Sequence, residues 1–102
     1  MQTIPIQSVP NQSLSVTIDR QRWTLTIKAA VSSMVVDLSL NDQVVIRGLR
    51  IMPNQPLIPY PYLATEGNFL MLTADEQIPW WERFGIDQTL VYATAAEIST
   101  YD

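Results

Sequence analysis

The residue types in this sequence leave little material for catalysis. The chain has no histidine and no cysteine, so the commonest general base, the thiol nucleophile and the usual transition-metal ligands are all missing. Ten carboxylates, several hydroxyl side chains and Lys28 remain. Asp75 and Glu76 are adjacent, and neighbours in an extended segment point apart, whereas a glycosidase needs two converging carboxyl groups. We therefore expect no enzyme and no catalytic residue.

Other ligand classes also lack their characteristic patterns. No loop carries several oxygen ligands at calcium-binding spacing, and no glycine-rich loop is suited to phosphate, so no metal, cofactor or small-molecule substrate is expected. The net charge of −4 is spread along the chain without a basic cluster, which argues against specific nucleic-acid binding. We expect Lys28 to be a solvated charge on a strand edge and not a Schiff-base lysine.

The N-terminus and the apolar segments bear on localisation. The stretch "MQTIPIQSVP" has no basic region and no apolar run of signal-peptide length. No segment approaches the roughly 20 apolar residues of a membrane-spanning helix. We expect a soluble chain that is made in a cytoplasm and either stays there or is assembled there into something larger.

The aromatic residues point instead to recognition. Tyr60 and Tyr62 alternate with prolines in "PYPY", and Trp80 and Trp81 are adjacent. One tryptophan together with Phe84 would suit the end of a small core. Two adjacent tryptophans cannot both point inward if the segment is extended, so one is a candidate anchor in a protein interface. A sugar-stacking platform is the alternative.

The alternation of apolar residues predicts a first hairpin from segments 13–19 and 23–28. A turn at positions 20 and 21 would place Ile18 opposite Trp23, whereas a turn at positions 19 and 20 would place Val16 there. Both registers put apolar side chains on one face, and both remain open.

A second hairpin is predicted from segments 34–40 and 44–51, around "NDQ". A two-residue turn would set Val36 opposite Arg47. We favour a three-residue loop, 41–43, which sets Leu38 opposite Ile46 and Asp37 opposite Arg47 as an ion pair. That register also pairs Leu40 with Val44 and Val35 with Leu49, which would make these strands partly apolar on both faces.

The rest of the chain completes an all-β pattern. The runs "NFLMLTA", 68–74, and "TLVYATAAE", 89–97, read as strands, although the tail from Ala93 is also compatible with a short helix. Four prolines in 53–61 predict a stiff loop, and "EQIPWWERFG" predicts an irregular connection with one helical turn after Pro79. The fold class predicted is a small antiparallel β-barrel or sandwich of about six strands with two long proline/aromatic connections.

The tripeptide Pro-Asn-Gln occurs at 10–12 and at 53–55. The first copy precedes the alternating "SLSVTI" and the second precedes "PLIPYPYL", so they do not mark one repeated unit. We interpret the first copy as the start of a strand, because proline fixes φ and asparagine tolerates turn conformations. A ligand-contacting loop is the alternative.

A family resemblance rests on the successive blocks "IPIQSVPNQSLSVTID", "RWTLTI", "VVDLSLNDQVVIRGLRI", "PLIPYPYL", "NFLML" and "LVYAT". In order and spacing these blocks resemble the small baseplate plug proteins of contractile-tailed phages, first described for a cyanophage. The blocks extend over most of the chain and end near Thr94. That family often has a turn glycine where this chain has Arg20, and another near Asp42, which leaves the turn geometry open.

The resemblance implies a small β-barrel-like structural protein of the virion without enzymatic activity. Such a plug would lie at the tail axis, between the tube and the central hub and spike, and would help to close the channel before DNA ejection. Its implied partners are the hub, spike and tail-tube proteins, in a symmetric multimer of the baseplate assembled in the host cytoplasm. The alternative function is a small carbohydrate-binding or adaptor β module.

The expected division of the chain is an N-terminal arm, 1–12, followed by a single β domain, 13–102. By analogy with the family, interface contacts are expected on the arm and on the long connections. The candidate interface residues are Ile4, Ile6, Pro10, Asn11, Gln12, Tyr60, Tyr62, Trp80 and Trp81.

Overall fold

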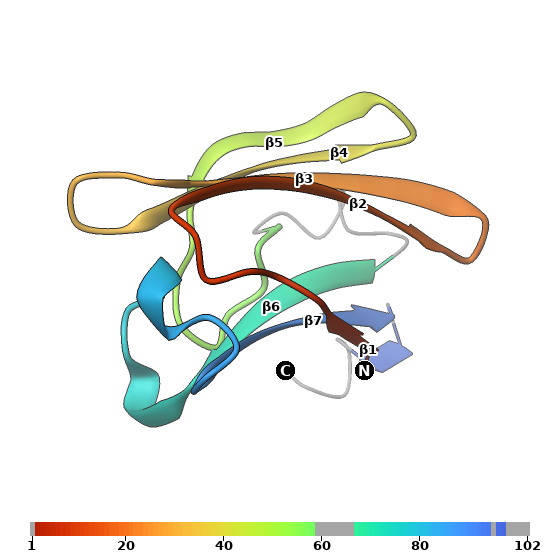
Figure 1. The fold of residues 1–102 in the computed structure, drawn as a ribbon. Coiled ribbons are helices and arrows are strands. Elements are labelled where there is room, and N and C mark those ends of the chain that lie inside the picture. Colours follow the sequence, from red (N-terminus) through yellow and green to blue (C-terminus); the bar gives the residue numbers. More distant parts are fainter. Residues whose placement is uncertain (1, 59–66, 95, 98–102) are drawn as a thin grey trace.

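A computed structural model of the chain describes residues 2–58, 67–94, 96 and 97. These residues form seven strands in two antiparallel sheets that pack face to face (Figure 1). The all-β prediction is confirmed, and the architecture is a sandwich and not a closed barrel. In the described part of the chain, no helix is long and apolar enough to cross a membrane.

One sheet has four strands in the order β2-β3-β4-β5. Alternate residues of its strands point into the sandwich, and Trp23, Leu25 and Ile27 are almost completely buried. The outer face is polar, with hydroxyl pairs such as Ser15 and Thr24, whose oxygens lie 3.2 Å apart. The strands are β2 (Asn11–Ile18), β3 (Gln21–Ala29), β4 (Met34–Leu40) and β5 (Gln43–Arg50).

The other sheet has three strands in the order β1-β7-β6, namely β1 (Gln2–Ile4), β7 (Gln88–Thr94) and β6 (Gly67–Thr73). Sequence patterning missed β1, because three residues before a proline carry no periodic signal. Beyond β7, the Glu97 N–H donates to Thr94 Oγ1 at 3.2 Å and the Glu97 carboxylate accepts the Thr94 N–H, as in a helix capping box.

The turn of the first hairpin lies at Asp19 and Arg20, with φ angles of 52° and 67°. Val16 therefore faces Trp23, which confirms the second of the two predicted registers. Two successive residues with positive φ give a turn whose twist matches that of the flanking strands. A glycine is the usual choice there, yet this chain uses Arg20.

The preferred loop of the second hairpin was wrong. Asn41 and Asp42 form a two-residue turn with φ angles of 52° and 68°, so Leu40 pairs with Gln43 and not with Val44. A register shift between Ser39 and Leu38 then brings Ile46 opposite Leu38, the predicted pair, by a different route, and a second shift follows between Leu38 and Val36. These β-bulges also rule out the alternative that placed Val36 opposite Arg47, since Leu49 lies there.

The bulges change the partners of Asp37. Its carboxylate accepts the Gly48 N–H at 2.6 Å and lies 3.1 Å from Lys28 Nζ, so the predicted ion pair with Arg47 is replaced by one with Lys28. Gly48 has φ +67°, which allows the bulge at little steric cost. Val35 faces Arg50 and not Leu49, so the predicted apolar pair on the outer face does not form.

The core lies between the two sheets and contains an aromatic cluster. The ring centroids of Trp23 and Phe69 are 5.2 Å apart with an interplanar angle of 81°, and those of Phe69 and Tyr92 are also 5.2 Å apart. Such edge-to-face contacts add to the stabilisation from burial. A smaller apolar cluster of Leu70, Val91 and Ala93 occupies the other face of β6 and β7, so these two strands are apolar on both faces.

Segment 53–58 runs beside β6 and occupies its free edge. Asn54 N–H donates to the Met71 carbonyl at 2.9 Å, and Leu57 N–H donates to the Phe69 carbonyl at 2.8 Å. The prolines prevent a regular strand, as predicted, but the segment still provides partners for the edge of β6. The remaining prolines of the predicted stiff loop lie outside the described residues.

Candidate docking interface

The connection between β6 and β7, residues 74–87, lies at one end of the sandwich, where the turn from β3 to β4 also lies (Figure 1). Large apolar side chains are exposed there, with exposed fractions of 102% for Val31, 72% for Ile86 and 46% for Ile78. Together with Trp80 and Trp81 these three residues define the docking end. An end of the molecule that exposes several large apolar side chains is a candidate interaction site.

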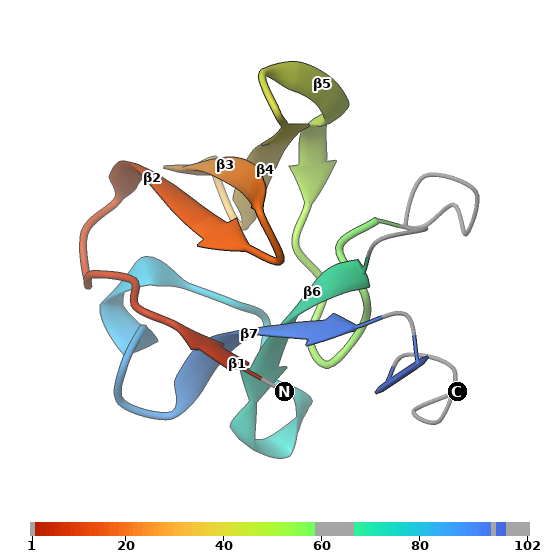
Figure 2. The ribbon, with the colours of Figure 1, turned by 90° about the vertical axis from the view of Figure 1, so that its right-hand side faces the viewer.

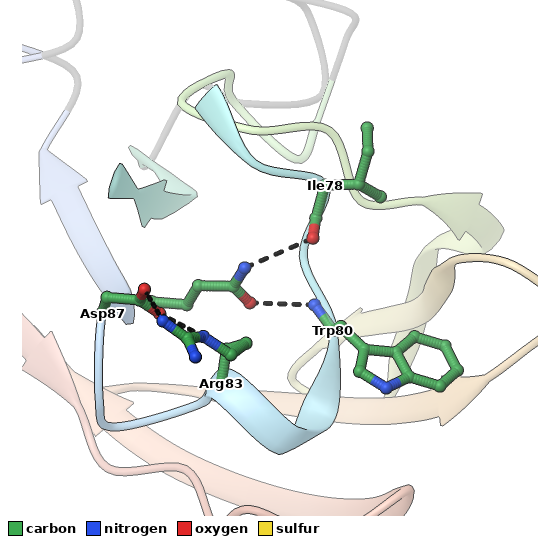
Figure 3. A network of polar contacts seen from close by, with 5 residues as sticks. Ile78, Trp80, Arg83 and Asp87 are labelled. Carbon is green, nitrogen blue, oxygen red and sulfur yellow. Dashed lines mark hydrogen bonds and ion pairs between the residues drawn. The ribbon is translucent and has the colours of Figure 1, made fainter. Parts of the chain in front are cut away.

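A buried glutamine holds the connection in place. Gln88 is 0% exposed; its Oε1 accepts the Trp80 N–H at 2.8 Å, and its Nε2 donates to the Ile78 carbonyl at 3.2 Å (Figure 3). Pro79, which lies between these two residues, has no N–H to satisfy. One side chain therefore binds the polar backbone groups on both sides of the proline.

The predicted helical turn after Pro79 is confirmed as a 3₁₀ turn, η3 (Trp81–Arg83), and another, η2 (Ala74–Glu76), follows β6. The Arg83 guanidinium binds the Asp87 carboxylate (Figure 3), with Nε 3.0 Å from Oδ1. This contact holds the pKa of Asp87 below its ordinary value. The pair closes the loop that returns the chain to β7.

Both tryptophans are partly buried against the core, with ring centroids 6.4 Å apart and an interplanar angle of 42°. Trp80 Nε1 donates to Glu82 Oε1 at 3.0 Å. The prediction that one tryptophan is an exposed anchor assumed an extended segment, but the backbone turns at Trp81 and both rings are partly buried against the core. Phe84, 3% exposed, lies inside the core.

The candidate residues of the N-terminal segment have different positions. Ile4 is 1% exposed and pairs with Leu90, so its side chain belongs to the core of this chain and is removed from the candidate surface. Ile6 is partly buried against the same core. Ser8 Oγ donates to the Trp81 carbonyl at 2.9 Å, which connects segment 5–10 to the docking end.

The Pro-Asn-Gln tripeptide starts β2, and pairing begins at Asn11. Asn11 Oδ1 accepts the Ala29 N–H at 3.4 Å, while the Gln12 amide forms two hydrogen bonds with the backbone of Gln7. Pro10 and Asn11 are exposed. In the second copy of the tripeptide, Asn54 accepts the Thr73 N–H in the same manner. Tyr60 and Tyr62 lie outside the described residues.

Comparison with known families decides the identity. The family described as cyanophage baseplate Pam3 plug gp18 matches residues 1–95. The chain belongs to this family. It is a structural protein of the virion tail baseplate, and the family is not an enzyme family. A search of curated proteins found no match.

In this baseplate plug protein, one concave surface on the outer face of the four-stranded sheet has a structural explanation. A groove of about 480 Å³ on the outer face of the four-stranded sheet contains Lys28, Asp37 and Arg47. Hydrogen bonds from the Gly48 N–H and from Lys28 lower the pKa of Asp37. Lys28 lies on an internal strand, so the prediction of an edge charge was wrong. No group of potential metal ligands occurs among the described side chains.

Sequence reasoning missed Gln88. The residue precedes an apolar run and carries no signal of its own, although an uncharged polar residue at the start of a buried strand is a candidate for such a role.

As a baseplate component, the chain has other baseplate proteins as partners.

Proposed function

We propose that this plug protein lies at the tail axis, between the tube and the central hub and spike, and helps to close the channel before DNA is ejected. It docks on these neighbours, as part of a symmetric multimer, through the docking end. The observation that carries this proposal is the gathering of exposed apolar residues and two half-open tryptophans on one braced connection.

The connection between β6 and β7 is held in place before it binds a partner. A flexible apolar loop loses conformational entropy when it docks, which lowers affinity. Here Gln88 and the Arg83–Asp87 pair already hold the connection. Each tryptophan keeps part of its ring open, and tryptophans are frequent among the residues that dominate binding energy in interfaces. The connection therefore supplies rigid anchors at low entropic cost.

The carbohydrate-binding alternative receives no support from the ring geometry. Sugar stacking uses flat, open aromatic faces, whereas Trp80 and Trp81 are tilted by 42° and partly covered by the core. The indole N–H of Trp80 is also already hydrogen-bonded to Glu82.

The test is incorporation into particles. A phage lacking the gene is complemented with Trp81→Ala or Ile86→Asp, and the amount of this chain per particle is measured by mass spectrometry of purified tails. Both variants should reduce incorporation at least several-fold while the isolated proteins still unfold cooperatively. Val44→Asp is the matched control, because Val44 is 55% exposed but lies on β5 beside the turn at the opposite end of the sandwich.

Two results would overturn the proposal. Normal incorporation of both variants would show that the docking end is not used. Loss of folding in isolated Trp81→Ala, combined with normal incorporation of Ile86→Asp, would make the tryptophan a core residue only.

A further inference from the structure

The sandwich protects three of its four sheet edges from further strand pairing. The strand β1 is three residues long and is followed by Pro5. The edge of β6 is occupied by segment 53–58. The strand β5 is interrupted by two register shifts and carries Arg47 and Arg50. Short length, covering segments, bulges and charges are the ways in which proteins block edge pairing.

The fourth edge, β2, has none of these protections. Its eight residues pair with β3 without a register shift, and they include no proline, glycine or charged residue. Figure 2 shows β2 at the margin of the four-stranded sheet, with β3 on one side. This edge therefore presents a long, regular and uncharged template for another strand.

The register identifies which backbone groups are free. Ile18 and Gln21 flank the two-residue turn and form a hydrogen-bonded pair, so the even-numbered residues of β2 bond to β3. The N–H and C=O groups of Ser13, Ser15 and Thr17 then point away from the sheet. Within the part of the chain that the structure describes, no backbone hydrogen bond to these three residues is found from outside the hairpin.

We propose that β2 pairs with β2 of a second copy of this chain, antiparallel, with Ser15 opposite Ser15 of that copy. In this register Ser13 lies opposite Thr17 of the second copy, and Leu14 lies opposite its Val16. The free backbone groups of each chain meet those of the other, and the two four-stranded sheets become continuous. The contact is isologous, so one surface serves both partners.

Three properties make the strand complementary to itself. No charge in Asn11–Ile18 opposes its own copy, although the chain has a net charge of −4. The hydroxyl pairs Ser13–Thr26 and Ser15–Thr24, both at 3.2 Å, show that this face accommodates such pairs, and the new register adds more of them. Leu14 and Val16 are only partly buried, so pairing would cover apolar surface on the inner face.

The absence of cysteine from the sequence provides a direct test of the register. Cα atoms of a hydrogen-bonded antiparallel pair lie about 5.5 Å apart, which suits a disulfide. Under mild oxidation Ser15→Cys should form a covalent dimer. A mixture of Ser13→Cys and Thr17→Cys should form a mixed dimer, and either variant alone should crosslink much less. Equal crosslinking of all three single variants would overturn the register.

A second experiment tests the edge itself by light scattering. Wild type and Ser15→Ala should be dimeric, because both keep the backbone N–H, and Ser15→Pro should be monomeric with its cooperative unfolding retained. If Ser15→Pro fails to fold, Ser15→Lys replaces it, since the two introduced ammonium groups would face each other. A wild-type monomer at high concentration, or a Ser15→Lys dimer, would overturn the proposal. This test does not depend on the proposed function.

Discussion

Gln88 lies fully buried beneath Trp80 and accepts its backbone N–H at 2.8 Å. The same side chain donates to the carbonyl of Ile78, so a single residue of β7 determines the path of the chain across Pro79. The position of the tryptophans thus depends on a residue outside their own connection.

Gln88→Leu should lower the free energy of unfolding by about 2–4 kcal/mol, because two partly buried backbone groups lose their hydrogen-bond partner. Urea unfolding measures this change. The matched control is Gln77→Leu, since Gln77 is an exposed glutamine of the same connection and should change stability little. Equal effects of the two substitutions would contradict the role of Gln88.

Arg20→Gly should raise the free energy of unfolding by about 0.5–1 kcal/mol, because Arg20 has φ +67° and glycine adopts this conformation without a Cβ clash. Arg20→Ala is the control at the same position, since alanine keeps the Cβ and should bring no gain. Thermal and urea unfolding measure both. A gain with alanine as large as with glycine would locate the effect in the arginine side chain.

The lowered pKa of Asp37 predicts a specific loss of stability in acid. Because the Gly48 N–H and Lys28 lower the pKa of this carboxyl in the folded state, its contribution is fully present above the ordinary aspartate pKa of about 3.9 and is lost as the pH falls below it. Asp37→Asn should therefore reduce the fall in melting temperature between pH 5 and pH 2.5. Asp87, whose pKa is lowered by Arg83, keeps part of the fall in the variant.

Lys28→Gln separates the two partners of Asp37. The Gly48 N–H is the larger cause of the lowered pKa, so this variant should keep more of the acid dependence than Asp37→Asn does. Melting temperatures of the three proteins across the same pH range give the comparison. A variant without Lys28 that behaves like Asp37→Asn would assign the whole effect to the ion pair.

Local patterns predicted the six longer strands, because alternation such as Leu14, Val16 and Ile18 reports directly on a buried face. They did not predict the bulges of β5, since a bulge depends on Gly48 adopting φ +67° and on Asp37 accepting its N–H from the next strand. The bulge at Gly48 accounts for the wrong ion pair, and the other register shift, between Ser39 and Leu38, accounts for the wrong loop.

The arrangement of side chains around Trp80 and Trp81 was predicted only in part, for a similar reason. The tryptophans are visible in the sequence, but their half-buried position depends on the turn at Trp81 and on Gln88, which belongs to the following strand, β7. Ile4 looked like part of a free arm because its pairing with Leu90 joins the two ends of the sequence. Long-range pairing of three residues leaves no local signal.

The bulges of β5 have a consequence for growth of the assembly. A sheet with two regular edges can add chains without limit and form filaments, which a phage-infected cell making many copies of a tail component has to avoid. In this sandwich the far edge of the four-stranded sheet is bent and charged, so pairing of β2 with β2 of a second copy leaves only two β5 strands as the outer edges. After this pairing no regular edge of the four-stranded sheet is left for a third copy, and the assembly has a fixed size.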